Sequence, residues 1–275
     1  MTQTVMGLGY ADCLTGAMVL STDMNAIMFP GLSESIVTIR PGDVNAEVVM
    51  NCDPDLIILA SQEQKDALSS LDVPILLISA ASIEDMEYNI KMIAEAIGTQ
   101  DALEKAQAYE DFYSDLKGTV EDKTKDIPDS EKPVVYLCVA DDPLTTLGNN
   151  SVAADWVTVS GGIYAPTLLG VEEFDGTLTA EQLVEANPDI IICTTVAGKD
   201  AILADPAYQN INAVVNDKIY INPLGGSVWF KAHFEAPLEL SWAPTVISPE
   251  QCADLDTRAY VDEFYSTFYG YEVTD

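Results

Sequence analysis

One stretch of this chain occurs twice, and this repeat constrains the fold more than any other feature. Residues 44–58 read VNAEVVMNCDPDLII and residues 178–192 read LTAEQLVEANPDIII, so the copies align at a fixed offset of 134 residues, from 44 to 178. Each copy predicts a short helix, a break at Asp-Pro or Asn-Pro, and an apolar strand. Two copies of one helix-strand unit predict two lobes of similar architecture.

The apolar runs of both copies are nearly continuous, which is typical of parallel strands that are covered on both faces. Runs of the same kind predict further strands, and helical patterns lie between them, for instance at 83–97 and 150–159. The run at 5–9 is also strand-like. The alternation predicts an α/β protein with two Rossmann-like lobes, each with a central parallel sheet. The expected strands are 35–39, 56–60 and 75–79 in the first half, and 134–139, 190–194 and 218–222 in the second.

Residues 100–126 predict a single long helix between the lobes. Apolar residues recur there at three- and four-residue spacing among charges, at Leu103, Ala106, Tyr109, Phe112 and Leu116. This is the pattern of an amphipathic helix, whereas a flexible linker would be rich in Gly and Ser. We therefore expect a first lobe at 1–99, a stiff interlobe helix at 100–126 and a second lobe at 127–275.

The charge of the chain excludes one class of partner. Forty-five acidic against twelve basic residues give a formal net charge of -33, which repels nucleic acid. The acidic surface favours solubility; the alternative is attraction to a cationic ligand or to a basic docking surface. No apolar stretch reaches the roughly 18 residues that a membrane span needs.

The cysteines and the single histidine argue against metal, redox and catalytic chemistry. The five cysteines are scattered without a CxxC pair, so we expect most of them in the core, and we expect no resident metal or cofactor. A two-lobed metallocluster scaffold would need cysteine ligands. In the repeat, Cys52 aligns with an alanine and Cys193 with a leucine, so the lobes share no cysteine position.

The main alternative from another class is a doubly wound α/β enzyme that acts on a small molecule in the interlobe cleft. Gly7-Leu8-Gly9 resembles the start of a dinucleotide loop, but Asp12 stands where the third glycine belongs. Neither a phosphate-binding GxxxxGK[ST] loop nor a GxSxG elbow occurs. A Ser-His-Asp triad would have to use His233, and nothing near it nominates the serine. We therefore predict that the protein is not an enzyme.

The order of several segments resembles the periplasmic binding proteins of ferric siderophore, haem and vitamin B12 importers. These segments are GLGYADCLTG, NAEVVMNCDPDLIILAS, KPVVYLCV, SVAADWVTVSGGIYAP, LTAEQLVEANPDIIICTT and AYVDEFYSTFYG. The resemblance implies an extracytoplasmic, monomeric binding protein of an ABC importer, which holds a metal chelate between its lobes and delivers it to a membrane permease. A signal segment is absent from this sequence, and the mature protein is expected either free or lipid-anchored.

The resemblance also implies a permease-docking role for one acidic residue on each lobe. The matching positions are Glu47 and Glu181, which the internal repeat aligns with each other. A glutamate in the first turn of a helix is also favoured by the helix dipole, by about 0.3–1 kcal/mol, with Thr177 or Thr179 as the cap. Both interpretations of the pair stay open at this point.

Ligands of open α/β sheets bind beyond the carboxyl ends of the strands, so we expect residues of the loops there to contact the ligand. The aromatic residues Trp229 and Phe230 lie beside the cation Lys231 and the only histidine, His233. Such a segment suits a large planar or chelate ligand. Alternatively, Trp229 and Phe230 begin a core helix and His233 has a structural role. The nominated residues are Met24, Asn25, Arg40, Ser61, Thr146, Asn149, Phe174, Trp229, Phe230, Lys231 and His233.

The residue types limit the class of ligand. One histidine argues against direct binding of zinc or manganese, which needs several ligands. Polyanionic chelates usually need clustered arginines, and only Arg40 and Arg258 exist. A neutral or weakly charged chelate, such as a hydroxamate siderophore or a corrinoid, is easier to accommodate, although backbone amides could bind an oxyanion. The stiff interlobe helix predicts that the lobes move little when ligand binds.

Overall fold

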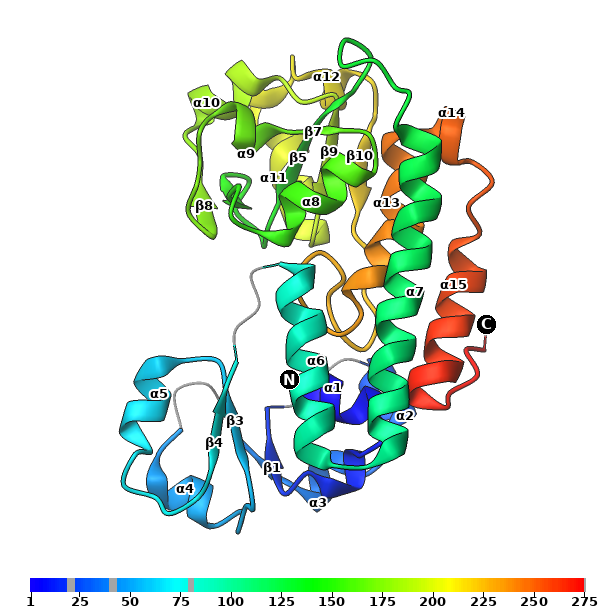
Figure 1. Cartoon of the computed structure of the whole chain (residues 1–275). Helices are drawn as coiled ribbons and strands as arrows, with labels where there is room; N and C mark the ends of the chain where they lie inside the picture. The colour runs from blue at the N-terminus through cyan, green and yellow to red at the C-terminus, as the bar shows by residue number, and fades with distance from the viewer. Residues whose placement is uncertain (19–22, 40–43, 79–81, 275) are drawn as a thin grey trace.

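The computed structural model describes residues 1–18, 23–39, 44–78 and 82–274. Two α/β lobes lie at the two ends of the long helix α7 (Gln100–Thr124), which runs along one side of the molecule (Figure 1). At 1.5 Å per residue, its 25 residues span about 38 Å. The predicted two-lobed α/β architecture with a long connecting helix is confirmed.

The first lobe alternates short helices with short strands. Its two pairs of parallel strands are β1 with β2 and β3 with β4. The elements are α1 (Thr2–Gly7), the 3-10 helix η1 (Ala11–Cys13), β1 (Gly16–Ala17), α2 (Asp23–Met28), α3 (Leu32–Ser35), β2 (Val37–Thr38), α4 (Ala46–Met50), β3 (Ile57–Leu59), α5 (Gln62–Ala67), β4 (Ile75–Leu77) and α6 (Ile83–Ile97).

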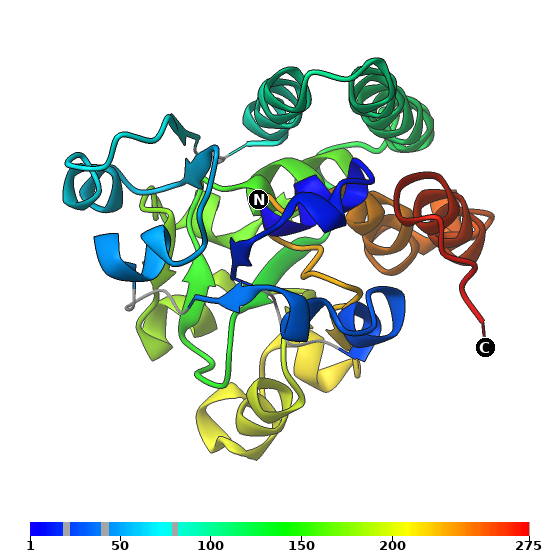
Figure 2. The same ribbon diagram turned by 90° about the horizontal axis from the view of Figure 1, so that it is seen from below.

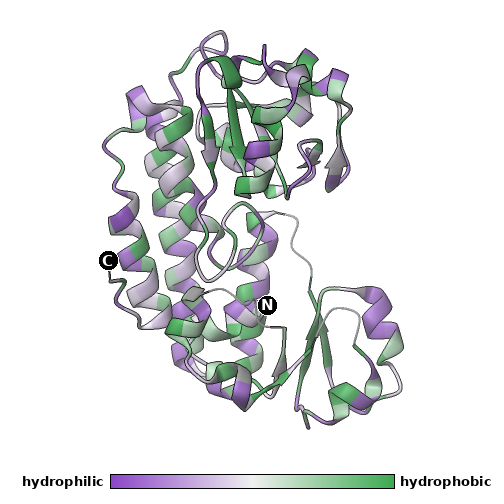
Figure 3. Cartoon of the chain, turned by 180° about the vertical axis from the view of Figure 1, so that it is seen from behind, coloured by the Kyte–Doolittle hydropathy of each residue, from purple (hydrophilic) through white to green (hydrophobic). Residues whose placement is uncertain are grey.

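The second lobe has a four-stranded parallel sheet in the order β10-β9-β5-β7, and a separate antiparallel pair, β6 with β8. The elements up to the last strand are β5 (Val134–Cys138), β6 (Thr145–Leu147), α8 (Val152–Val159), β7 (Ile163–Tyr164), α9 (Ala165–Leu168), β8 (Asp175–Thr177), α10 (Ala180–Ala186), β9 (Ile190–Cys193), α11 (Val196–Ala204), the 3-10 helix η3 (Pro206–Tyr208), α12 (Asn212–Val215) and β10 (Ile219–Ile221). The strands β5 and β9 are strongly apolar (Figure 3), as sheets covered on both faces require.

The two copies of the repeat form the same local structure. Asn45 caps α4 through its Oδ1, which accepts from the backbone N–H of Val48 at 3.0 Å, and Thr179 caps α10 in a capping box. After each helix comes a residue with positive φ, Asp53 at 47° and Asn187 at 42°, directly before the proline. Aspartate and asparagine tolerate this left-handed conformation better than most residues, so both copies turn into their strands in the same way.

The first lobe departs from the sequence-based expectation in two respects. The strand-like run at 5–9 lies in and after helix α1, where Val5, Met6 and Leu8 are buried. A short apolar run is compatible with both a buried strand and a buried helix. Here the helical segment ends at Gly9, whose φ is 89°. In addition, the strands do not join in one sheet, because no hydrogen bonds link β1 to β3 among the described residues.

The helices α6 and α7 lie side by side (Figure 2), and each buries one apolar face. Facing α7 are α13 (Glu239–Ile247) and α14 (Pro249–Cys252) of the second lobe. The chain then turns back, and α15 (Thr257–Phe264) runs beside the lower half of α7 in Figure 1. The π-helix Tyr265–Tyr269 that follows packs against α1 of the first lobe. The C-terminal residues thus contact the first lobe, although they follow the second lobe in the sequence. The domain limits at 1–99, 100–126 and 127–275 stay predictions.

Aromatic rings from three parts of the chain pack around the middle of α7. Tyr109 is fully buried, and its ring centroid lies 4.9 Å from that of Phe234 and 5.8 Å from that of Phe268. Phe264 and Phe268 lie 4.7 Å apart. This aromatic cluster joins the interlobe helix, the loop before α13 and the C-terminal helix, so it couples the lobes through side-chain packing.

We expect Tyr109→Ala to lower the free energy of unfolding by about 3–5 kcal/mol, as for other large buried aromatic residues. Tyr109→Phe should be neutral or slightly stabilising, because the buried hydroxyl has no hydrogen-bond partner among the described residues. Urea denaturation of both variants measures the difference. Tyr88→Ala on the exposed face of α6, where the side chain is 63% exposed, is the control.

Candidate ligand-binding site between the lobes

A cavity of about 230 Å³ lies between the two lobes. Ala60 and Ile78 follow the strands β3 and β4, so the first lobe contributes the carboxyl ends of its strands, as predicted for ligand sites of this architecture. The second lobe contributes the loop that precedes the 3-10 helix η4 (Ala236–Leu238). The wall consists of Met1, Thr4, Ala60, Ile78, Met86, Asn89, Ile90, Ala232, His233 and Phe234.

Among the described residues, His233 is the only titratable side chain in this wall. Burial, and secondarily the positive charges of the amino terminus and Lys231, lower the pKa of His233 to about 4. The imidazole is therefore neutral at pH 7, and one ring nitrogen has a free lone pair. A neutral imidazole can accept a hydrogen bond or coordinate a metal, which an imidazolium cannot do.

A fully buried carboxylate fixes the loop that carries His233. Glu235 Oε2 accepts hydrogen bonds from the Ser227 N–H at 3.1 Å, from Trp229 Nε1 at 3.2 Å and from Tyr265 Oη at 3.1 Å. Its Oε1 accepts from Tyr269 Oη at 3.0 Å. Burial raises the pKa of Glu235, and these donors oppose the rise.

The turn before this loop needs glycine because the network approaches it closely. A Cβ on Gly225 would overlap both Tyr265 Oη and Glu235 Oε2. The Gly226 N–H donates to Tyr265 Oη at 3.0 Å, and the Gly226 carbonyl accepts from the Asn25 amide at 2.7 Å and from Gln3 Nε2 at 3.1 Å. The turn is thus held by the C-terminal helix on one side and by the first lobe on the other.

A second buried carboxylate lies at the start of α13. Glu239 is fully buried and accepts both of its hydrogen bonds from the Asn222 amide, at 2.7 and 2.9 Å. Asn222 follows β10, at the carboxyl end of the second sheet. Burial raises the pKa of Glu239 to about 8, so the carboxyl group is mostly protonated at pH 7.

The nominated aromatic residues are part of the core in this structure. Trp229 and Phe230 are 5% and 6% exposed and belong to the main core cluster, in a loop and not at the start of a helix. The Lys231 ammonium lies 5.7 Å from the centroid of the Phe230 ring, a cation–π contact. Asn25 is buried against the Gly226 carbonyl, and Met24 is half-buried beside it.

The nominated residues of the β6 and β8 region lie together, away from the cavity wall. Thr146 is buried on β6, within 3.3 Å of Tyr164 Oη. Asn149 accepts from the Thr167 hydroxyl at 2.7 Å, and its backbone N–H donates to Val171. Phe174 is 40% exposed, next to β8, and its carbonyl accepts from the Gly148 N–H. The structure brings these residues together with each other but not with His233.

Ser61 caps helix α5, where its Oγ accepts from the Gln64 N–H. Arg40 lies outside the described residues. Of the ten nominated residues that the structure describes, His233 alone lines the interlobe cavity. Glu235 and Glu239 were missed, although acidic residues in the apolar segment FEAPLELSW are a signal for buried carboxylates.

Glu47 and Glu181 occupy equivalent places on the two lobes. Each is exposed in the first turn of its helix, α4 or α10, and Thr179 is the cap of α10. In Figure 1, α4 lies at the lower end of the molecule and α10 at the upper end. Among the described residues, no group of three or more His, Cys, Asp or Glu is placed to hold a metal ion. Four of the five free cysteines are buried, as expected.

Two α/β lobes, a continuous long helix between them and a cavity at the carboxyl ends of the first lobe's strands are typical of a two-lobed binding protein. A family model described as periplasmic binding protein matches residues 1–223. The chain belongs to this family.

Relatives and solved structures agree with this assignment. YvrC of Bacillus subtilis, an uncharacterized ABC transporter substrate-binding lipoprotein, is 26% identical over 227 residues, which cover 80% of this chain and 68% of that protein. A periplasmic solute binding protein from Veillonella parvula matches with a TM-score of 0.81 at 25% identity, over 99% of this chain and 86% of the other. The molybdate-bound MolA of Haemophilus influenzae matches with a TM-score of 0.80 at 17% identity, over 99% and 90%.

The protein is therefore an extracytoplasmic substrate-binding component of an ABC transporter, and it is not an enzyme. In the part of the chain that the structure describes, no helix is both long and apolar enough to cross a membrane.

Glu239 should make stability depend on pH. Its pKa is higher in the folded state than in the unfolded chain, so its contribution is full below about pH 4.5 and is lost as the pH rises through about 8. Between pH 5 and 8 we expect a loss on the order of 3 kcal/mol from this group. Glu239→Gln keeps an acceptor for Asn222 and should flatten this decline, measured as the melting temperature at each pH. An identical decline in the variant would contradict the assignment.

Proposed function

We propose that the protein captures a compact, neutral or weakly charged metal chelate in the interlobe cavity and presents it to the permease. The observation that carries this proposal is the neutral imidazole of His233 in a cavity shared by both lobes. A neutral imidazole can occupy an open coordination position of a bound metal. No carboxylate lines the cavity within the described residues, so a neutral complex faces no negative side chain there.

The size of the cavity favours small members of this ligand class. Its volume of about 230 Å³ lies below the roughly 300–1,000 Å³ of ordinary small-molecule sites. A compact hydroxamate chelate therefore fits better than haem or a corrinoid, which would require a wider separation of the lobes. Because α7 is continuous, we expect only a small rearrangement of the lobes on binding.

A second candidate ligand is a tetrahedral oxyanion. Its support is the likeness to MolA, whose structure contains molybdate, together with the small volume of the cavity. Backbone amides and the nearby Lys231 would then have to balance the charge of the anion.

Native mass spectrometry with an absorption spectrum tests the ligand class. The panel contains ferric hydroxamate and catecholate siderophores, a corrinoid, haem and molybdate. We expect a one-to-one complex with a ferric dihydroxamate, which leaves coordination positions of the iron open for His233. A complex with molybdate alone would favour the second candidate, and binding of none of the panel would contradict both.

His233→Gln should weaken binding of the chelate at least tenfold and shift its absorption band, because a metal-ligand bond is lost. In the unmodified protein we expect the affinity to hold from pH 7 to pH 5 and to fall as the pH approaches 4, where the imidazole becomes protonated. Titration calorimetry across this range measures the effect. Unchanged affinity and spectrum in the variant would remove His233 from the site.

We further propose that Glu47 and Glu181 dock into basic pockets of the permease. Charge reversal to lysine at either position should reduce uptake at least several-fold in vesicles that contain the permease and its ATPase, while the affinity for ligand in solution stays the same. Glu63→Lys is the matched control, because Glu63 is exposed in the first turn of α5 but has no partner in the repeat. Equal loss in the control would indicate a general effect of charge.

A further inference from the structure

Two neighbouring strands of the second lobe end on cysteines that lie side by side. Cys138 is the last residue of β5, and Cys193 is the last residue of β9. The strands are parallel, and the two cysteines are partners in the register. Both belong to one core cluster, whereas the residues before them, Leu137 and Ile192, belong to the main core cluster on the other face of the sheet. The alternation of a strand therefore directs both thiols to the same face.

The two thiols interact in a closed space. A hydrogen bond with Cys138 raises the pKa of the Cys193 thiol, and burial raises it further. Both side chains are fully buried. The first turn of α11 packs on them closely, since a Cβ on Gly198 would lie 3.2 Å from Cys138 Sγ. The sulfur atoms are thus neighbours of each other and are shielded from solvent.

The spacing of the two strands suits a bond between these cysteines. Neighbouring strands of a sheet lie about 4.7–4.9 Å apart, and the Cα atoms of disulfide-linked residues are usually about 4.4–6.8 Å apart. The Cβ atoms of partners in a parallel register are about as far apart as the strands, which is more than the mean of about 3.8 Å in disulfides. A bond between Cys138 and Cys193 would therefore draw the two strand ends together and would be strained, which makes it easy to reduce.

The loops that follow the two strands already bond to each other. The Ala140 N–H donates to Thr194 Oγ1 at 2.9 Å, and the Thr195 hydroxyl donates to the Ala140 carbonyl at 3.1 Å. The Cys193 carbonyl accepts from the Asn222 N–H at 2.8 Å. A link between the cysteines would hold these loops together at the carboxyl end of the second sheet. Because Ala140 is exposed, local opening of the loops gives a reagent access to the thiols.

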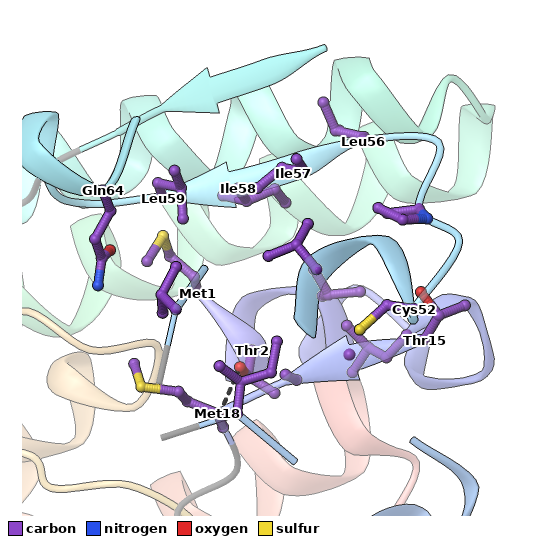
Figure 4. Close-up of a pocket in the computed structure, with 18 of the residues that line it drawn as sticks. Met1, Thr2, Thr15, Met18, Cys52, Leu56, Ile57, Ile58, Leu59 and Gln64 are labelled. Atoms are coloured by element: carbon purple, nitrogen blue, oxygen red, sulfur yellow. Dashed lines mark hydrogen bonds between the residues drawn. The ribbon is translucent and has the colours of Figure 1, made fainter. Parts of the chain in front are cut away.

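The other three cysteines provide comparisons within the same chain. Cys252 is fully buried in α14. Cys52 lies at the wall of a first-lobe cavity of about 430 Å³, close to Thr15 (Figure 4). Cys13, which is exposed, lines the same cavity. A link between Cys13 and Cys52 is therefore the competing disulfide of this chain.

We propose that Cys138 and Cys193 are a reversible redox pair, which a disulfide oxidant of the extracytoplasmic compartment converts into a cross-strand disulfide. Compartments outside the cytoplasm allow disulfides to form and persist. The thiolate of one cysteine attacks the oxidant and releases one thiol from it. The thiolate of the other cysteine then attacks the protein sulfur of this mixed disulfide and releases the second thiol. One S–S bond breaks in the oxidant, one forms in the protein, and two electrons and two protons pass to the oxidant.

Refolding of the full chain in a mixture of oxidised and reduced glutathione tests the proposal. After denaturation we expect Cys138 and Cys193 to resist alkylation by iodoacetamide while Cys252 reacts, and mass spectrometry of the unreduced digest should link the two protected peptides. The folded, reduced protein should form the same link at least tenfold more slowly, because both thiols are buried. Excess reduced glutathione should reverse the link.

Single substitutions separate this pair from the other cysteines. Cys193→Ala should abolish the link and leave Cys138 open to alkylation after denaturation. Cys252→Ala is the matched control, because it also replaces a fully buried cysteine, and it should keep the link. Alkylation of both Cys138 and Cys193 in the unmodified, oxidised chain would overturn the proposal, as would a link from either of them to another cysteine. A Cys138–Cys193 link that excess reduced glutathione leaves intact would overturn its reversibility.

Discussion

The carboxylate of Glu235 is the interaction on which the arrangement of the two lobes most depends. It is fully buried, and among the described residues four donors from the 227–229 loop and the C-terminal segment, none of them a cation, satisfy its oxygens. Removal of these donors would leave a buried charge, which is far more costly than the loss of an ordinary hydrogen bond. The network thereby places His233 at the cavity, fixes the glycine turn against Asn25, and orients the rings that pack on α7.

The parts of the fold that follow from local chemistry were predictable from the sequence. The repeat predicted the helix-strand units around Glu47 and Glu181, and the charged amphipathic pattern predicted α7 almost to its ends. Helix α1 was not predictable, because a short run such as residues 5–9 is apolar in either state. The division of the first sheet depends on pairing between distant segments, which no local pattern encodes.

The residues of the candidate site were harder to predict from the sequence than the elements of the fold. Proximity to a strand end pointed to eleven residues, and of the ten that the structure describes only His233 lines the cavity between the lobes. Trp229 and Phe230 have the residue types of a ligand platform, yet the Glu235 network draws Trp229 into the core. The conformation of the loop determines whether an aromatic side chain points toward a ligand or into the protein core. That conformation depends on hydrogen bonds to buried polar residues that are distant in the sequence.

The return of the C-terminal segment to the first lobe has a consequence for biogenesis. Tyr265 and Tyr269 are among the last residues of the chain, yet they bond to Gly226 and Glu235 and pack against Phe29 and α1. During synthesis the first lobe emerges long before these residues, so it cannot complete its native contacts while the chain is still growing. The first lobe therefore gains these contacts only after residues 265–269 have been synthesised.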